Sequence, residues 1–121
     1  VVICERFSDS TMAYQGYGAG LDLEVIQRAD ELATGGLKPD LTFLFDLNAE
    51  EGGARISARN GRGALDRMEG KGFFFQERVR RGYLKLAENA RDRITVIDCA
   101  GLTPQEAQKA LWEKYLELKD R

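Results

Sequence analysis

Three short apolar segments constrain the fold of this chain more than any other feature. They comprise residues 1–4, 41–47 and 94–99, and each is almost continuously apolar and rich in β-branched or aromatic side chains. Such segments are typical of strands that are buried on both faces of a parallel sheet. Helical patterns follow each of them, so the sequence predicts an α/β layer structure with right-handed crossover connections.

Three further segments carry the spacing of amphipathic helices. The first covers residues 22–33 and is followed by Gly35 and Gly36, which provide the left-handed backbone that ends a helix. The second runs from about residue 70 to 91. The third begins with the capping box Thr103-Pro104-Gln105-Glu106. The expected buried faces are Val25, Ile26, Ala29, Leu32 and Ala33 in the first helix, Phe75, Val79, Tyr83, Leu86 and Ala90 in the second, and Ala107, Ala110, Leu111, Tyr115 and Leu118 in the third.

Length and composition limit the class of protein. The 121 residues suit one domain, and 43% hydrophobic with 31% charged residues exclude a fibre or a disordered tail. No apolar run approaches the roughly 20 residues that cross a bilayer. The chain has no histidine and only two cysteines, Cys4 and Cys99, which excludes His-based catalysis and a Cys/His zinc site. We expect both cysteines to be buried free thiols in a soluble, cytoplasmic protein.

Basic charge is concentrated in one part of the chain. Residues 55–93 hold eleven basic side chains, nine of them arginine, against five acidic ones, although the whole chain has a net charge of −2. This balance gives no general attraction for nucleic acid. The cluster indicates either a polyanionic ligand or a solvated, arginine-rich helix face. Residues 55–67 contain four arginines, Gly61 and Gly63, and predict a polar loop between two helices.

The residues after the first apolar segment are expected at the carboxyl edge of the sheet, where open α/β folds bind ligands. Glu5 is suited to hold Mg²⁺, and Arg6 to bind two oxygens of a phosphate. Ser10 and Thr11 offer hydrogen bonds, and Tyr14 offers a flat wall. The alternative interpretation is a surface ion pair followed by a polar turn.

The same residues resemble a segment of thymidylate kinases. Residues 2–22, which include Glu-Arg-Phe and Ala-Tyr-Gln-Gly, are similar to the family's Asp-Arg-aromatic and Ala-Tyr-Gln-Gly segment. The resemblance continues in order through residues 38–42, 62–69, 74–87 and 97–98. It covers nearly the whole chain, and several matches at sensible spacing are far more specific than a single one.

The resemblance implies a P-loop nucleoside monophosphate kinase fold, which is a three-layer α/β structure around a parallel sheet. The chain is expected to be a fragment of it, with residues 1–121 forming the C-terminal part of a thymidylate kinase domain. The phosphate-binding motif Gly-x-x-x-x-Gly-Lys-Ser/Thr does not occur in this sequence. The resemblance begins at the family's third strand, and the absent first strand would lie between this strand and the next one.

The activity that the resemblance implies is transfer of the γ-phosphoryl group of ATP to dTMP, which gives dTDP, with Mg²⁺ and in a homodimer. Arg6 would bind the acceptor phosphate, and Tyr14 would pack near the sugar and disfavour a 2′-hydroxyl. Glu5 stands where the family usually has Asp, and the resemblance therefore implies that Glu5 holds the Mg²⁺. The residues implied to contact the nucleotide are Arg6, Ser10, Thr11, Tyr14 and Gln15.

Residues from about 55 to 69 correspond to the family's lid. Arg59, Arg62 and Arg67 would stabilise charge on the moving phosphoryl group while a closing lid excludes water. Two alternatives stay open. One is a deoxynucleoside kinase, which Glu-Arg at this place also resembles, and the other is a non-catalytic fragment or subunit that needs a partner chain to supply the central strand.

Overall fold

The structure, a computed structural model, describes residues 1–60 and 71–119. The sheet in this part of the chain has two parallel strands, β1 (Thr42–Asp46) and β2 (Ile94–Asp98), which pair along their whole length. The α/β arrangement with parallel strands is therefore confirmed. The larger sheet that the resemblance implies is not formed by the described residues.

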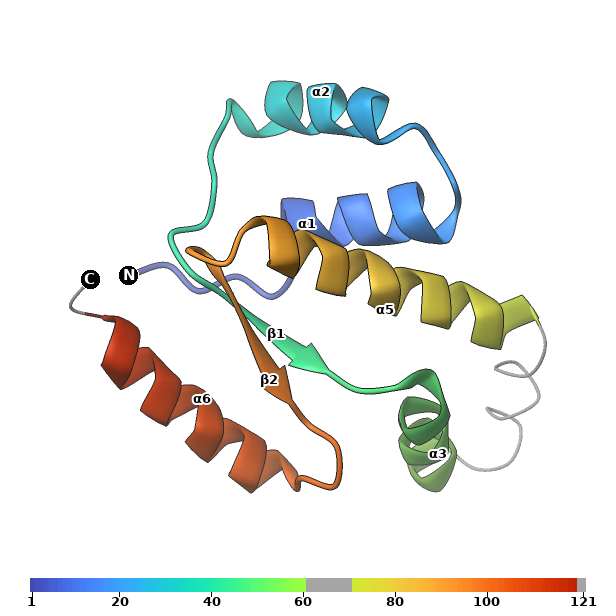
Figure 1. The fold of residues 1–121 in the computed structure, drawn as a ribbon, viewed down its shortest axis with the longest axis vertical. Helices are drawn as coiled ribbons and strands as arrows, with labels where there is room; N and C mark the ends of the chain where they lie inside the picture. The colour runs from blue at the N-terminus through green and yellow to red at the C-terminus, as the bar shows by residue number, and fades with distance from the viewer. Residues whose placement is uncertain (61–70, 120–121) are drawn as a thin grey trace.

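Helices α5 (Lys71–Asn89) and α6 (Pro104–Leu118) lie on opposite sides of these strands (Figure 1). Asp46 of β1 pairs with Arg80 of α5, so its side chain is on the face of the sheet that α5 covers. Asp46 is in register with Asp98 of β2, and side chains alternate between the two faces of a strand, so the neighbouring Ile97 is on the opposite face. Ile97 is buried on the side of α6. Among the described residues, the buried apolar side chains are Ala13, Ile26, Val79, Ala87, Ile94, Ile97 and Cys99.

The prediction of a buried strand at residues 1–4 is wrong. These residues have no strand conformation, and Val1, Val2 and Ile3 are almost fully exposed. A strand needs a neighbour to accept its backbone hydrogen bonds, and among the described residues only β1 and β2 pair. Cys4 is consequently exposed, contrary to expectation. Cys99 is the buried free thiol that the sequence predicts, and burial raises the pKa of this thiol.

Residues 8–18 form a helical unit near the N-terminus that packs against α5. It consists of the short helix α1 (Ser8–Thr11) and the π-helix η1 (Met12–Gly18). The packing between this unit and α5 is close. A Cβ on Gly18 would lie 2.8 Å from side-chain atoms of Phe75 and Val79, so glycine is needed for η1 to approach α5 this closely.

Helix α2 (Leu23–Thr34) begins and ends as predicted. The Asp22 carboxylate accepts hydrogen bonds from the first turn, and Gly35 ends the helix with a left-handed φ of 63°. Its expected buried face is largely wrong, because Ile26 is buried whereas Val25 and Leu32 are exposed. The physical reason is position: α2 packs on α1 and η1 at the outside of the structure and does not cover the sheet (Figure 1).

Helix α3 (Ala49–Asn60) corrects the prediction of a polar loop from residue 55 onward, because residues 55–60 are helical. The Asn48 side chain accepts a hydrogen bond from the Glu51 N–H at 2.7 Å and caps the helix. Glu77 of α5 accepts a second one from the Ala49 N–H at 3.1 Å. The remainder of the predicted loop, residues 61–67, lies outside the described residues.

The capping box of α6 is confirmed. Thr103 Oγ1 accepts from the Glu106 N–H at 3.3 Å, and the Glu106 carboxylate accepts from the Thr103 N–H at 2.7 Å. Residues 99–103, here termed the β2–α6 loop, connect this helix to the sheet. Within residues 1–60 and 71–119, no helix combines the length and the apolar character that crossing a membrane requires.

Packing of α5 on the N-terminal helical unit gives a test of the fold. A Cβ on Gly82 would lie 2.6–2.8 Å from Tyr17 atoms near the backbone, so Gly82→Ala should lower the free energy of unfolding by about 1–3 kcal/mol. Gly53→Ala in α3 is the matched control, since no atom lies within 4 Å of its Cβ and the change should raise stability by about 0.5–1 kcal/mol. Urea unfolding measures both, and equal stabilities of the two variants would contradict the packing.

Candidate functional site

Arg6 and Tyr14 form the centre of the candidate site. The Arg6 guanidinium lies over the Tyr14 ring, 5.1 Å from its centroid, and donates a hydrogen bond of 3.4 Å to the Tyr14 hydroxyl. The Arg6 backbone has a φ of 65°, which is uncommon for a residue other than glycine and is often found at functional sites. The Arg6 side chain is exposed, so a cation is presented to solvent beside an aromatic face.

An aromatic cluster on α5 supports Tyr14. The ring of Tyr14 makes edge contacts with Phe75 and Tyr83, with centroids 6.0 Å and 6.3 Å away. The hydroxyls of Tyr83 and Ser10 form a hydrogen bond of 2.6 Å. Because Phe75 and Tyr83 are two turns apart, they fix Tyr14 against the middle of α5.

A second arginine contacts the same cluster. Arg78 lies with its guanidinium 5.8 Å from the Phe75 centroid, and its Nε donates to the Gly18 carbonyl at 3.0 Å. The sequence interpretation missed Arg78 and Tyr83 as members of the site, and assigned Tyr83 to an apolar stripe. The hydroxyl of Tyr83 could have indicated its place in the site, because a partly buried Tyr hydroxyl usually has a hydrogen-bond partner.

The structure brings three of the predicted substrate-binding residues together, namely Arg6, Ser10 and Tyr14. Thr11 and Gln15 lie on the same helical unit and are exposed. Among the predicted lid arginines, Arg59 is an exposed residue of α3, whereas Arg62 and Arg67 lie outside the described residues.

The start of α1 lies elsewhere than expected. Asp9 accepts two hydrogen bonds from Arg93, of 2.7 Å and 2.8 Å, and Arg93 also donates to the Thr42 hydroxyl at 3.1 Å. Thr42 begins β1 and Arg93 precedes β2, so Asp9 lies at the amino ends of the strands and not at the carboxyl edge. This partly buried bidentate pair explains the difference. Its hydrogen bonds hold the pKa of Arg93 above the usual range.

The carboxyl edge of the sheet is held by a second bidentate pair. Arg80 of α5 donates to both carboxylate oxygens of Asp46, at 2.8 Å and 2.9 Å, and these bonds raise the pKa of Arg80. Asp98, at the same end of β2, accepts from the Ala100 N–H at 2.9 Å. The edge therefore has a fixed charge pair between β1 and α5.

Glu51 and Arg55 of α3 border the same edge. Arg55 donates to the Glu51 carboxylate at 2.8 Å and to two carbonyls of the β2–α6 loop. Glu51 accepts the Gly101 N–H at 3.0 Å. The Gly101 N–H and the Arg55 side chain lower the pKa of Glu51.

Glu5, the predicted metal ligand, is an exposed carboxylate. Its hard oxygens suit Mg²⁺, which is commonly held by one or two carboxylates, waters and substrate phosphates. The described residues contain no cluster of three or more acidic, His or Cys side chains that would bind a metal without such a substrate.

Comparison with known proteins identifies the class. The thymidylate kinase family model matches residues 1–110. A thymidylate kinase of Trichodesmium erythraeum (strain IMS101) is 47% identical over 123 aligned positions, which cover 98% of this chain and 52% of the relative. That of Desulfosudis oleivorans is 46% identical over 91% of the chain and 53% of the relative, and that of Desulfovibrio desulfuricans is 43% identical over 100% and 58%.

The chain therefore belongs to the thymidylate kinase family. It spans about half the length of the curated relatives that it matches.

The lowered pKa of Glu51 predicts a pH dependence of stability. Because the folded-state pKa lies below the ordinary value of 4.5, the contribution of Glu51 is present above pH 4.5 and is lost as pH falls through the lowered value. The stability difference between the wild type and Glu51→Gln should be constant near neutral pH and shrink in acid. Urea unfolding across this range measures it, with Glu113→Gln on the exposed face of α6 as control. A difference that does not change with pH would contradict the prediction.

Proposed function

We propose that this chain is the acceptor-phosphate and lid portion of a thymidylate kinase that converts dTMP and ATP into dTDP and ADP. Membership of the family over residues 1–110 is the observation that carries the proposal. The exposed Arg6 guanidinium beside Tyr14 supports it. In a nucleotide the phosphate is next to the sugar, so a cation that binds the phosphate and an aromatic ring that packs on the sugar must be neighbours in the site. By the full-length kinase we mean this chain together with the half of such a kinase that carries the P-loop motif.

In this proposal Arg6 binds the phosphate of dTMP with its planar fork of donors. Tyr14 packs along the deoxyribose, and its contacts with Phe75 and Tyr83 hold the ring so that it disfavours a 2′-hydroxyl. Ser10 lies along the nucleotide while its hydroxyl remains bonded to Tyr83. Thr11 and Gln15 add polar contacts from the exposed side of the helical unit.

Phosphoryl transfer requires positioning and charge stabilisation more than covalent participation by the protein. We assign this stabilisation to Arg59, Arg62 and Arg67 of the lid, residues 55–69. Mg²⁺ bound to ATP would neutralise phosphate charge, with Glu5 as the carboxylate that holds its water shell. The proposal also includes a cytoplasmic homodimer with no nucleic-acid partner.

Steady-state kinetics of the full-length kinase test these roles. Arg6→Ala should raise the KM for dTMP about tenfold or more, because a charged hydrogen bond to phosphate is lost. Arg62→Ala should mainly lower kcat, by about 10³-fold if it acts as catalytic arginines do in related phosphoryl transfer. Arg28→Ala, in an exposed pair on α2, is the control and should change neither constant.

Two outcomes would contradict the proposal. A wild-type enzyme that releases no ADP in response to dTMP is not a thymidylate kinase, and one that responds to thymidine instead is the deoxynucleoside kinase alternative. Equal effects of Arg6→Ala and Arg62→Ala on both constants would reject the division of roles.

A second candidate is a subunit that requires a partner chain. Two observations favour it: the sheet has only two strands in the described part, and the apolar residues Val1, Val2 and Ile3 are exposed. Such a sheet is marginally stable alone. We predict that the isolated 121-residue chain is inactive and associates in size-exclusion chromatography. A monomer with a sharp thermal transition would contradict this candidate.

A further inference from the structure

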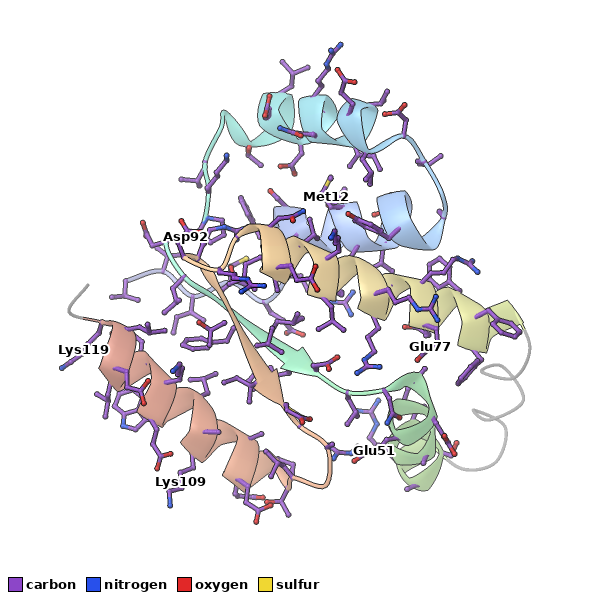
Figure 2. All side chains as sticks on the ribbon, in the orientation of Figure 1. Met12, Glu51, Glu77, Asp92, Lys109 and Lys119 are labelled. Carbon is purple, nitrogen blue, oxygen red and sulfur yellow. The ribbon has the colours of Figure 1, made fainter. Side chains whose placement is uncertain are left out.

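Tyr83 of α5 contacts the helical unit of the candidate site at two points. Its hydroxyl forms a hydrogen bond of 2.6 Å with the Ser10 hydroxyl, and its ring lies edge-on to Tyr14 with an angle of 83° between the ring planes. Ser10 and Tyr14 are four residues apart, which is about one helical turn. Figure 2 shows this unit, in which Met12 is labelled, alongside α5. One side chain of α5 therefore holds both the Tyr14 ring and the turn that precedes it.

Phe75, the other aromatic neighbour of Tyr14, holds the ring by packing alone. Its ring contacts Tyr14 on one side and has the Arg78 guanidinium 5.8 Å from its centroid. A phenyl ring has no hydrogen-bonding group, so it can shift without breaking a hydrogen bond. The Tyr83–Ser10 bond is at the short end of the range for hydroxyl pairs and is partly buried, so its loss is costly. The orientation of Tyr14 therefore depends on the Tyr83 hydroxyl.

A fixed orientation of Tyr14 determines how strongly the site can reject a ribonucleotide. A ribonucleotide carries one more hydroxyl than the matching deoxyribonucleotide, and a pocket discriminates only weakly against a single added hydroxyl unless that group meets an obstacle. The obstacle must also be unable to move aside. Arg6 lies over the Tyr14 ring, and Phe75 and Tyr83 contact its edges. Among these three neighbours, only Tyr83 is also hydrogen-bonded to the turn before Tyr14.

We propose that Tyr83 is a positioning residue that sets the selectivity of the acceptor site for 2′-deoxyribonucleotides over ribonucleotides. It acts through its hydrogen bond to Ser10, which keeps the Tyr14 ring where a 2′-hydroxyl would clash with it. This inference rests on the proposed function and assigns its choice of sugar to a residue of α5. The Tyr83 hydroxyl does not need to touch the nucleotide, because its partner is Ser10.

The test compares dTMP with ribothymidine 5′-monophosphate, which differs from dTMP only by the 2′-hydroxyl, in the full-length kinase. Tyr83→Phe keeps the ring and removes the hydroxyl. It should lower the ratio of kcat/KM for dTMP to kcat/KM for the ribonucleotide by about three- to tenfold, as the loss of one hydrogen bond predicts. Tyr17→Phe is the matched control and should leave the ratio unchanged. Tyr17 also lies between η1 and α5, but its hydroxyl has no hydrogen bond with another described residue.

A double-mutant cycle with Ser10→Ala tests whether Tyr83 acts through Ser10. In the Ser10→Ala background, Tyr83→Phe should cause no further fall in the ratio, because the bond is already absent. An equal fall with and without the Ser10 hydroxyl would overturn the inference. So would an unchanged ratio in Tyr83→Phe, including a proportional loss of activity on both nucleotides with a lowered thermal midpoint, which indicates structural support alone.

Calorimetric titration with the two nucleotides in the absence of ATP separates this inference from the proposed function. If the wild type binds dTMP but does not phosphorylate it, the proposed function fails, whereas a reduced preference for dTMP in Tyr83→Phe still supports the positioning role. Equal affinities of the wild type for dTMP and ribothymidine 5′-monophosphate would overturn the inference.

Discussion

The close approach of η1 to α5 is the contact on which the candidate site depends. Gly18 lets the π-helix approach the side chains of α5, and Gly82 lets α5 approach Tyr17 of η1. This approach brings Tyr14 against the aromatic cluster of α5, and Tyr14 in turn carries the Arg6 guanidinium. Helix α5 is itself tied to the sheet through the Asp46 pair. A loss of contact between η1 and α5 would therefore disperse the site without altering any of its residues.

The arginine-rich composition has two physical meanings in this molecule. Arg80 and Arg93 form bidentate pairs with carboxylates and fix α5 and α1 to opposite ends of the strands. Arg55 donates hydrogen bonds to two backbone carbonyls of the β2–α6 loop. These three are structural cations, so the charge of residues 55–93 overstates what is available to a polyanion. Arg6 lies outside that segment, and its side chain is exposed beside an aromatic ring.

Features with local causes could be predicted from the sequence. The caps of α2 and α6 depend on residues within four positions, and both are found where the pattern places them. The family resemblance was also accessible, because its motifs are contiguous. The failures concern long-range partners. The pattern of residues 1–4 predicts a strand, but the part of the chain that the structure describes offers them no strand to pair with. The Ser10–Tyr83 hydrogen bond joins residues that no local pattern connects. The buried face of α2 was also mispredicted, because which of its side chains are buried depends on the elements that pack against the helix.

The central claim is that Arg6, held over Tyr14, recognises the phosphate of the acceptor nucleotide. Calorimetric titration of the full-length kinase with dTMP and with thymidine tests it most directly, because the two ligands differ only in that phosphate. We predict that the wild type binds dTMP far more tightly than thymidine, and that Arg6→Ala binds both with nearly equal affinity. An unchanged preference for dTMP in Arg6→Ala would contradict the account.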